Sequence, residues 1–136
     1  MVAVVKAPLP ELRPMTRADL AAVAAIEAQA YEFPWSQHIF RDCLDAGHKC
    51  WVLDMQGVVI GYGILSSGAG EAHVLNVCVA PAEQGNGHGA RLLRRLLDLA
   101  RWSGAQRVYL EVRPSNSLAQ AMYEGIGFNE IGRRPN

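Results

Sequence analysis

Three glycines stand at the alternate positions 85, 87 and 89, between an apolar stretch and a leucine-rich one. The stretch before them, Glu71–Ala80, is rich in valine and predicts a strand. The stretch after them predicts a helix to about Trp102, because apolar residues recur at helical spacing: Leu92, Leu93, Leu96, Leu97 and Ala100. Another strand is predicted at Arg107–Val112. A strand, a glycine loop, a helix and a strand in this order predict a crossover between two parallel strands.

The residues before this unit predict antiparallel strands. A short extended piece is expected at Glu11–Met15, and two longer strands at Lys49–Met55 and Val58–Leu65. Gln56-Gly57 joins the two longer strands, and the stretch Ser66–Gly70 supplies the next turn. The middle of the chain is therefore expected to form successive hairpins.

Two helices are predicted between the first strand and these hairpins. Thr16 begins one of them, with Asp19 three residues later in an arrangement that resembles a capping box. Ser36 can cap the second helix and Gly47 can end it. The apolar stripe of the second helix is expected to comprise Ile39, Phe40, Cys43 and Leu44.

The expected fold is of the α/β (α+β) class, a mixed and mostly antiparallel sheet with helices on both faces. The chain has 136 residues, the size of one typical domain, and no linker divides it. We therefore expect a single domain over residues 1–136, with the first ten residues as a loose arm. A last short helix, capped by Asn116 or Ser117, is predicted to follow the strand at Arg107–Val112.

Composition narrows the possible partners and the compartment. The formal net charge is zero, so no overall basic field points to nucleic acid. No apolar run approaches the ~20 residues needed to span a bilayer, and the start does not resemble a signal peptide. The cysteines, Cys43, Cys50 and Cys78, are odd in number and form no Cys-x-x-Cys pair. We therefore expect reduced thiols, a cytoplasmic location and no membrane contact. We also expect no metal site, since the histidines share no ligand spacing with the cysteines.

The glycine loop is either a flexible turn or an anion site. The first N–H groups of a helix have no partner within the helix and carry partial positive charge, and glycines let a bulky anion approach them. A Walker loop is excluded because Ala90 follows Gly89. A dinucleotide fingerprint fits Gly85, Gly87 and Ala90, but "PAEQ" separates it from its strand. A third pattern, Gln/Arg-x-x-Gly-x-Gly/Ala, is matched by Gln84, Gly87 and Gly89.

From Leu12 to Phe128 the chain resembles the GNAT family, the Gcn5-related N-acetyltransferases. The likeness rests on "VLNVCVAPAEQGNGHGARLL", "VYLEV" and "NSLAQAMYEGIGF". It looks closer still to the RimI group of bacterial ribosomal-protein-alanine N-acetyltransferases, through "YEFPWSQHIF", "LEVRPSN" and "GFNEIGRRPN". The resemblance implies transfer of acetyl from acetyl-coenzyme A to the N-terminal alanine of ribosomal small-subunit protein eighteen. The family continues into a further strand, which we expect this sequence to lack because it ends eight residues after Phe128.

The resemblance also implies roles for particular residues. Glu111 matches the proton acceptor and Tyr123 the group that protonates the sulfur of coenzyme A. The strand segment of Val77, Cys78 and Val79 would offer backbone N–H groups to the thioester carbonyl. Asn116 would form a hydrogen bond to the cofactor. The pyrophosphate would be held by the loop residues Gly85, Asn86, Gly87, His88, Gly89 and Ala90.

The residues alone leave other assignments open. Glu111 also fits a solvated carboxylate on an exposed strand face, Tyr123 a core aromatic and Asn116 a helix cap. Asn86 and His88 also fit ordinary loop residues. No histidine is placed to activate Cys78, so direct transfer is favoured over an acyl-cysteine.

The acceptor side is less constrained by the sequence. Tyr31, Phe33 and Trp35 could line an acceptor groove or plug the core beneath a turn, and Glu32 could attract a protonated N-terminus. Other functions remain open: acetylation of a small amine or a lysine, a coenzyme A-binding module without catalysis, and, remotely, a nicotinamide-binding oxidoreductase. Retention of both Glu111 and Tyr123 argues against a module that only binds.

Overall fold

The computed structural model describes residues 9–110, which form one five-stranded sheet and three α-helices. The strands are β1 (Glu11–Pro14), β2 (Lys49–Met55), β3 (Val58–Gly68), β4 (Glu71–Val79) and β5 (Arg107–Leu110). The helices are α1 (Leu20–Ala30), α2 (Gln37–Asp45) and α3 (His88–Trp102). Short 3-10 turns, η1 (Arg17–Asp19) and η2 (Pro81–Glu83), precede α1 and α3. Each strand and helix predicted within this range is therefore present.

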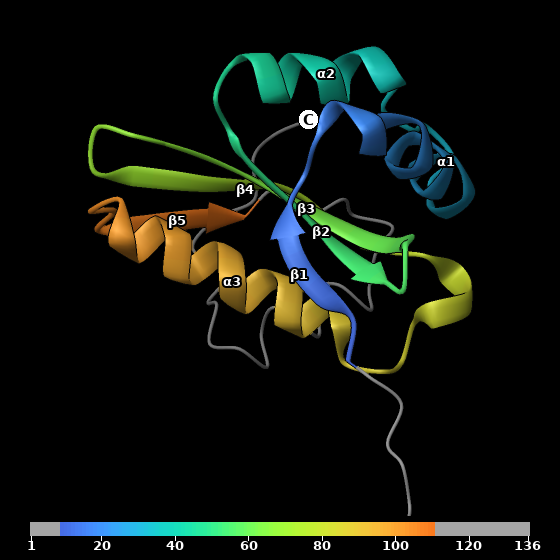
Figure 1. Cartoon of the computed structure of the whole chain (residues 1–136). Coiled ribbons are helices and arrows are strands. Elements are labelled where there is room, and N and C mark those ends of the chain that lie inside the picture. Colours follow the sequence, from blue (N-terminus) through green and yellow to red (C-terminus); the bar gives the residue numbers. More distant parts are fainter. Residues whose placement is uncertain (1–8, 111–136) are drawn as a thin grey trace, which may run out of the picture.

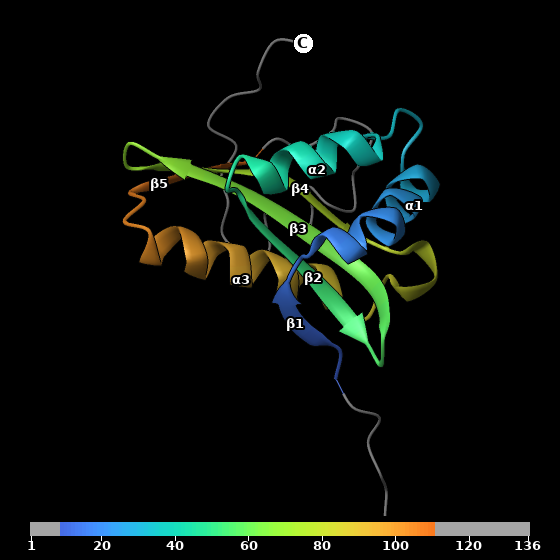
Figure 2. The ribbon, with the colours of Figure 1, turned by 45° about the horizontal axis from the view of Figure 1, so that its top comes forward.

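The strands lie in sequence order across the sheet, β1-β2-β3-β4-β5. The pairs β1–β2, β2–β3 and β3–β4 are antiparallel. The last pair, β4–β5, is parallel, with Val74 opposite Leu110. Helix α3 makes the connection between the two parallel strands (Figure 1). Helices α1 and α2 cover one face of the sheet and α3 covers the other (Figure 2). The predicted mixed, mostly antiparallel sheet with helices on both faces is confirmed.

Local signals place the turns and the helix starts. Gln56 and Gly57 both have positive φ, 51° and 90°, as a two-residue hairpin turn requires. The next hairpin turn is tighter than predicted, because β3 continues to Gly68 and leaves only Ala69 and Gly70 to turn. The Thr16 N–H donates to the Asp19 carboxylate at 2.8 Å, which fixes the entry to η1 and α1.

Helix α2 differs in one respect from its prediction. Its cap is confirmed, since the Ser36 hydroxyl accepts from the Ile39 N–H at 3.4 Å. Phe40 and Cys43 face the core, but Ile39 is 40% exposed and does not belong to the buried stripe. The helix is only nine residues long, so fewer of its apolar residues contact the sheet than their helical spacing predicted.

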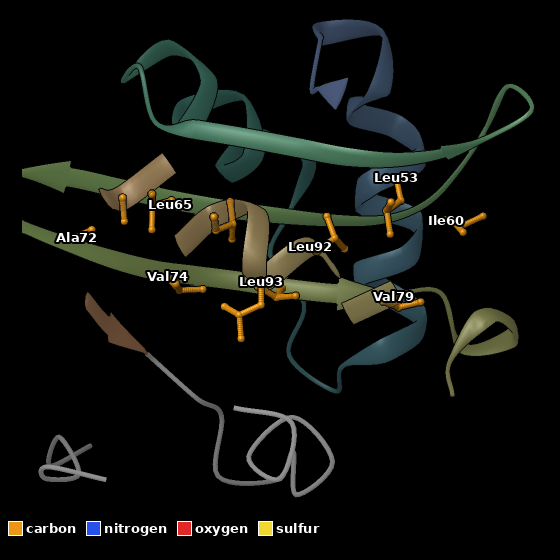
Figure 3. Packing of buried hydrophobic residues seen from close by; sticks show 11 residues of the cluster. Leu53, Ile60, Leu65, Ala72, Val74, Val79, Leu92 and Leu93 are labelled. Carbon is orange, nitrogen blue, oxygen red and sulfur yellow. The ribbon is translucent and has the colours of Figure 1, made fainter. Parts of the chain in front are cut away.

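Helix α3 packs closely against the sheet. Leu92, Leu93 and Leu96 are fully buried among strand side chains, as Figure 3 shows for the first two. Gly63 on β3 lies beneath the helix, and a Cβ added there would come within 2.9 Å of Leu96 Cδ1. The absence of a side chain at Gly63 therefore sets the separation between helix and sheet.

The other face is lined by α1 and α2 around an aromatic group. Phe40 lies between Trp35 and Tyr62, with ring centroids 5.4 Å and 5.3 Å away. Cys43, Cys50 and Cys78 are buried, and no disulfide joins them. Burial raises the pKa of Cys50 to about 12, so this thiol stays protonated at neutral pH. Among the helices formed by residues 9–110, none combines the length and apolar character needed to cross a membrane.

A β-bulge divides β4 into two halves. Ile64 pairs with Asn76 and Leu65 with Val74, so Leu75 has no partner on β3. Before the bulge Ala72 and Val74 face α3, and after it Val77 and Val79 do. An extra residue reverses the alternation of side chains, so that Asn76 and Cys78 face α1 and α2 instead.

Candidate active site

The glycine loop leads directly into the first turn of α3. Gly85 and Gly87 have φ of 87° and 80°, and Gly87 is the residue before the helix. The first helical hydrogen bond runs from the Arg91 N–H to the Gly87 carbonyl at 3.1 Å. The N–H groups of residues 88–90 therefore have no acceptor within the helix and carry the positive end of its dipole.

Space is open above this loop. Among residues 9–110, a Cβ added at Gly85 or Gly87 would meet no atom within 4 Å. Both positions have the left-handed conformation that side chains disfavour, which explains why the sequence has glycine there. Backbone N–H groups in open space at a helix N-terminus suit a phosphate or diphosphate. The loop therefore fits the diphosphate of a nucleotide-like molecule such as coenzyme A.

The end of β4 adjoins this loop. The Ala80 N–H donates to the Ile60 carbonyl at 2.8 Å, so it points to β3. Since the direction alternates along a strand, the Cys78 N–H also points to β3, and those of Val77 and Val79 point to the opposite edge. That edge is the side on which β5 lies. Of the predicted trio, Val77 and Val79 thus direct N–H groups to the β5 side of β4, whereas Cys78 does not.

Side-chain contacts of the loop were not foreseen from the sequence. The Gln84 amide donates to the Val79 carbonyl at 3.1 Å, which ties the loop to the end of β4. The Asn86 amide donates to the Glu83 carbonyl at 3.4 Å, within the loop itself. Arg91, in the first turn of α3, donates to the Pro10 carbonyl ahead of β1. Backbone amides are therefore the main donors that the loop presents.

A buried carboxylate lies on the other face of β4. Glu27 of α1 is fully buried and accepts hydrogen bonds from three of the described residues. Its Oε1 accepts from the Tyr62 hydroxyl at 2.7 Å and from the Asn76 amide at 2.8 Å, and its Oε2 accepts from the Trp35 N–H at 2.7 Å. Burial, with Cys78 and Glu27 as neighbours, raises the pKa of Tyr62 above its ordinary value, so the phenol remains a donor.

From the sequence, no role was predicted for Glu27. The signal was present, because a carboxylate at an apolar helical position is rarely left without donors. Asn76 could not have been found in the same way. It meets Glu27 only because the bulge at Leu75 turns it to that face.

The three aromatic residues between α1 and α2 have different environments. Tyr31 and Trp35 are half-buried and pack against the core beside Phe40. Phe33 is 83% exposed, and Glu32 beside it is also exposed. Tyr31 and Trp35 thus pack against the core in part, whereas Phe33 exposes most of its surface to solvent.

Three predicted site residues lie outside the described residues: Glu111, Asn116 and Tyr123. Glu111 directly follows Leu110, the last described residue of β5. Tyr109 stacks on His73 while Val108 and Leu110 pack toward α3, so the side chains of β5 alternate between the two faces of the sheet up to Leu110. Over residues 9–110, no three His, Cys, Asp or Glu side chains are grouped as a metal site requires.

Comparison with known proteins places this arrangement in context. The profile of the acetyltransferase (GNAT) family matches residues 17–128. An Escherichia coli relative named [ribosomal protein bS18]-alanine N-acetyltransferase is 36% identical, over 87% of this chain and 80% of its own. A Mycobacterium tuberculosis relative named N-alpha-acetyltransferase RimI is 42% identical, over 88% of this chain and 78% of its own.

Solved structures show the same architecture. The crystal structure of the ribosomal-protein-S18-alanine N-acetyltransferase from Escherichia coli superposes with a TM-score of 0.83 and 33% identity, covering 91% of this chain and 80% of that one. The Salmonella typhimurium protein yncA, solved with its cofactor acetyl-CoA, gives a TM-score of 0.76 and 25% identity over 88% and 79%.

Proposed function

The chain belongs to the acetyltransferase (GNAT) family and is an N-acetyltransferase, and from that premise we propose its donor and acceptor. The donor is acetyl-coenzyme A, and the acceptor is the N-terminal amine of a protein, the alanine of ribosomal protein bS18. Two observations support this. A relative at 36% identity is named a bS18-alanine N-acetyltransferase and one at 42% an N-alpha-acetyltransferase, and the loop before α3 fits a diphosphate. The reaction is proposed to take place in the cytoplasm, within one domain spanning residues 1–136.

Acetyl-coenzyme A supplies an acetyl thioester, and the chain must hold it by its diphosphate. We assign this to the N–H groups of residues 88–90 and to the open backbone at Gly85 and Gly87. Gln84 keeps the loop in place through the Val79 carbonyl rather than touching the diphosphate. The binding loop and the end of β4 are thereby held together as one unit.

Stabilising the oxyanion is proposed to fall to the end of β4. The N–H groups of Val77 and Val79 point to the β5 side of β4, whereas the Cys78 N–H is directed at β3. A preorganised N–H group near developing negative charge lowers the barrier by about 2.7–4 kcal/mol. We place the thioester carbonyl within reach of the Val77 or Val79 N–H.

The proton transfers are proposed for residues beyond β5. An α-amine has a pKa of about 7.7–8.0, so a nearby carboxylate can remove its proton at neutral pH. Glu111 is proposed to accept this proton, because it follows Leu110 on the strand parallel to β4. Tyr123 is proposed to donate a proton to the departing thiolate, and Asn116 to bond to the donor molecule.

The acceptor is proposed to approach from the side of the loop between α1 and α2. Phe33 offers an exposed apolar ring, and Glu32 a negative charge that attracts a protonated N-terminus. Tyr31 and Trp35 hold this loop on the core rather than touching the acceptor.

A peptide assay tests the proposal. The protein is incubated with acetyl-coenzyme A and two peptides, one with a free N-terminal alanine and one with a blocked N-terminus and a free lysine. Mass spectrometry should find acetyl on the terminal amine only, and preference for the lysine would overturn the proposed acceptor. Glu111→Gln should lower kcat about 100-fold or more while the Kd for coenzyme A stays unchanged. Loss of coenzyme A binding in this variant would show that Glu111 has a structural role instead.

A further inference from the structure

Glu27 joins three segments that are far apart in the sequence. The carboxylate extends from α1 and accepts from Tyr62 on β3, Asn76 on β4 and the backbone of Trp35. Asn76 stands directly after the bulge and one residue before Val77. Trp35 lies in the loop between α1 and α2, two residues after the exposed Phe33. One side chain thus connects the acceptor-side loop to the strand of the proposed oxyanion site.

The division of donors between the two oxygens gives each a separate task. Oε1 is shared by Tyr62 and Asn76 and therefore holds the carboxylate on the sheet. Oε2 takes the Trp35 N–H and therefore holds the loop on the carboxylate. Pro34 precedes Trp35 and has no N–H to donate, so between these two residues the main-chain donor is the Trp35 amide. Hydrogen bonds to a charged acceptor are about twice as strong as neutral ones, and burial strengthens them further.

We propose that Glu27 is a positioning residue, which fixes the loop of residues 31–36 relative to the bulged half of β4 and so sets where the acceptor amine meets the thioester. This inference rests on the proposed function, because it assigns that loop to the acceptor. Glu27 touches neither substrate, so its removal should affect the acceptor and leave the binding of coenzyme A alone. The bulge belongs to this device, since it turns Asn76 toward Glu27 and keeps Val77 on the other face.

The test compares two substitutions on the same face of α1. Glu27→Gln keeps the shape of the side chain but offers one acceptor oxygen in place of two, so the three donors are no longer all satisfied. Val23→Ala removes apolar contacts from the same fully buried face and leaves Glu27 in place. It controls for loss of stability alone. Steady-state kinetics with the N-terminal alanine peptide and calorimetry with coenzyme A are measured at 15 °C.

We expect E27Q to lower kcat/KM for the peptide by about 10-fold or more, the equivalent of one hydrogen bond to a charged group. The Kd for coenzyme A should change less than 2-fold, and V23A should keep the kcat/KM of the wild type. Equal losses in E27Q and V23A, or a matching loss of coenzyme A binding in E27Q, would overturn the proposal.

A second measurement does not depend on how the variants fold. Hydrogen exchange of the wild-type protein should find the Trp35 amide protected to the same degree as amides in β3. Exchange at the rate of an unprotected amide would refute the connection to Glu27. Failure of the proposed function is distinguishable, because the wild-type protein would then acetylate no N-terminal peptide whatever the protection of Trp35. That result would overturn the acceptor role as well.

Discussion

Gly87→Ala separates the strain of the loop from its role in binding. Gly87 has φ of 80°, and a Cβ there meets nothing within 4 Å, so the substitution introduces conformational strain and no clash. The left-handed region costs a side chain roughly 1–2 kcal/mol. The less flexible unfolded chain offsets about 0.4–1 kcal/mol of this. The net loss should be about 1 kcal/mol, or roughly 3–5 °C in Tm for a domain of this size.

Gly70→Ala is the matched control. Gly70 has φ of 79°, and an added Cβ there also meets nothing within 4 Å. Gly70 precedes β4, whereas the glycine loop follows that strand. The nine residues of β4, at about 3.3 Å each, therefore separate Gly70 from the loop by roughly 30 Å. Both variants should therefore lose the same stability for the same reason.

Binding of coenzyme A should distinguish them. A methyl group at position 87 occupies open space beside the helix N-terminus, where the diphosphate is proposed to lie. Loss of one charge-assisted hydrogen bond costs about 1.5–3 kcal/mol, so the Kd should rise about 10- to 150-fold. Isothermal titration calorimetry should find this increase in G87A and an unchanged Kd in G70A. Unchanged affinity in G87A, or equal weakening in both, would refute the assignment of the loop.

Two predictions concern stability. Gly63→Val should lower the free energy of unfolding by about 1–3 kcal/mol, because Leu96 Cδ1 lies 2.9 Å from the added Cβ. In thermal unfolding the control Gly68→Val should be near neutral, because a Cβ at Gly68 meets no described atom within 4 Å. Equal effects of the two substitutions would contradict the close packing of α3. Hydrogen bonds from Arg13 lower the pKa of the Asp19 carboxyl. The ionised carboxylate therefore stabilises the folded protein above the unfolded-state pKa of about 3.9. This stabilisation is lost as the pH falls through the lower pKa of the folded state. Asp19→Asn should therefore cost about 1–3 kcal/mol at pH 7 in urea unfolding, with a difference from wild type that shrinks below about pH 4; a constant difference would refute the linkage.

Local signals were sufficient for most of the fold. Strand β2 begins and ends where the sequence predicts, and α3 ends at Trp102 as expected. The Gln56-Gly57 turn and the Ser36 cap are set by residues within four positions of one another, so they can be recognised without the rest of the structure. The exposure of Ile39 could not, because it depends on how much of a nine-residue helix the sheet covers.

The site was predicted in part. The glycine loop was found because its residues are contiguous and their conformation is local. The contact of Gln84 with Val79 was missed, since the sequence pattern assigned Gln84 to the phosphate motif and not to the strand. Glu111, Asn116 and Tyr123 lie outside the described residues and remain predictions.

By itself the sequence determined the order of the strands and helices and their turns and caps, because each of these depends on short-range spacing. Its motifs, taken together, also carried the resemblance to the family. Only the tertiary structure decided which face each residue of β4 occupies. One unpaired residue, Leu75, reverses the alternation, and a pattern with a period of two cannot show where such a residue is inserted. That reversal brings Asn76 to Glu27 and leaves Val77 facing α3. The buried carboxylate is stable there because its three donors, from residues 35, 62 and 76, converge only in the folded chain.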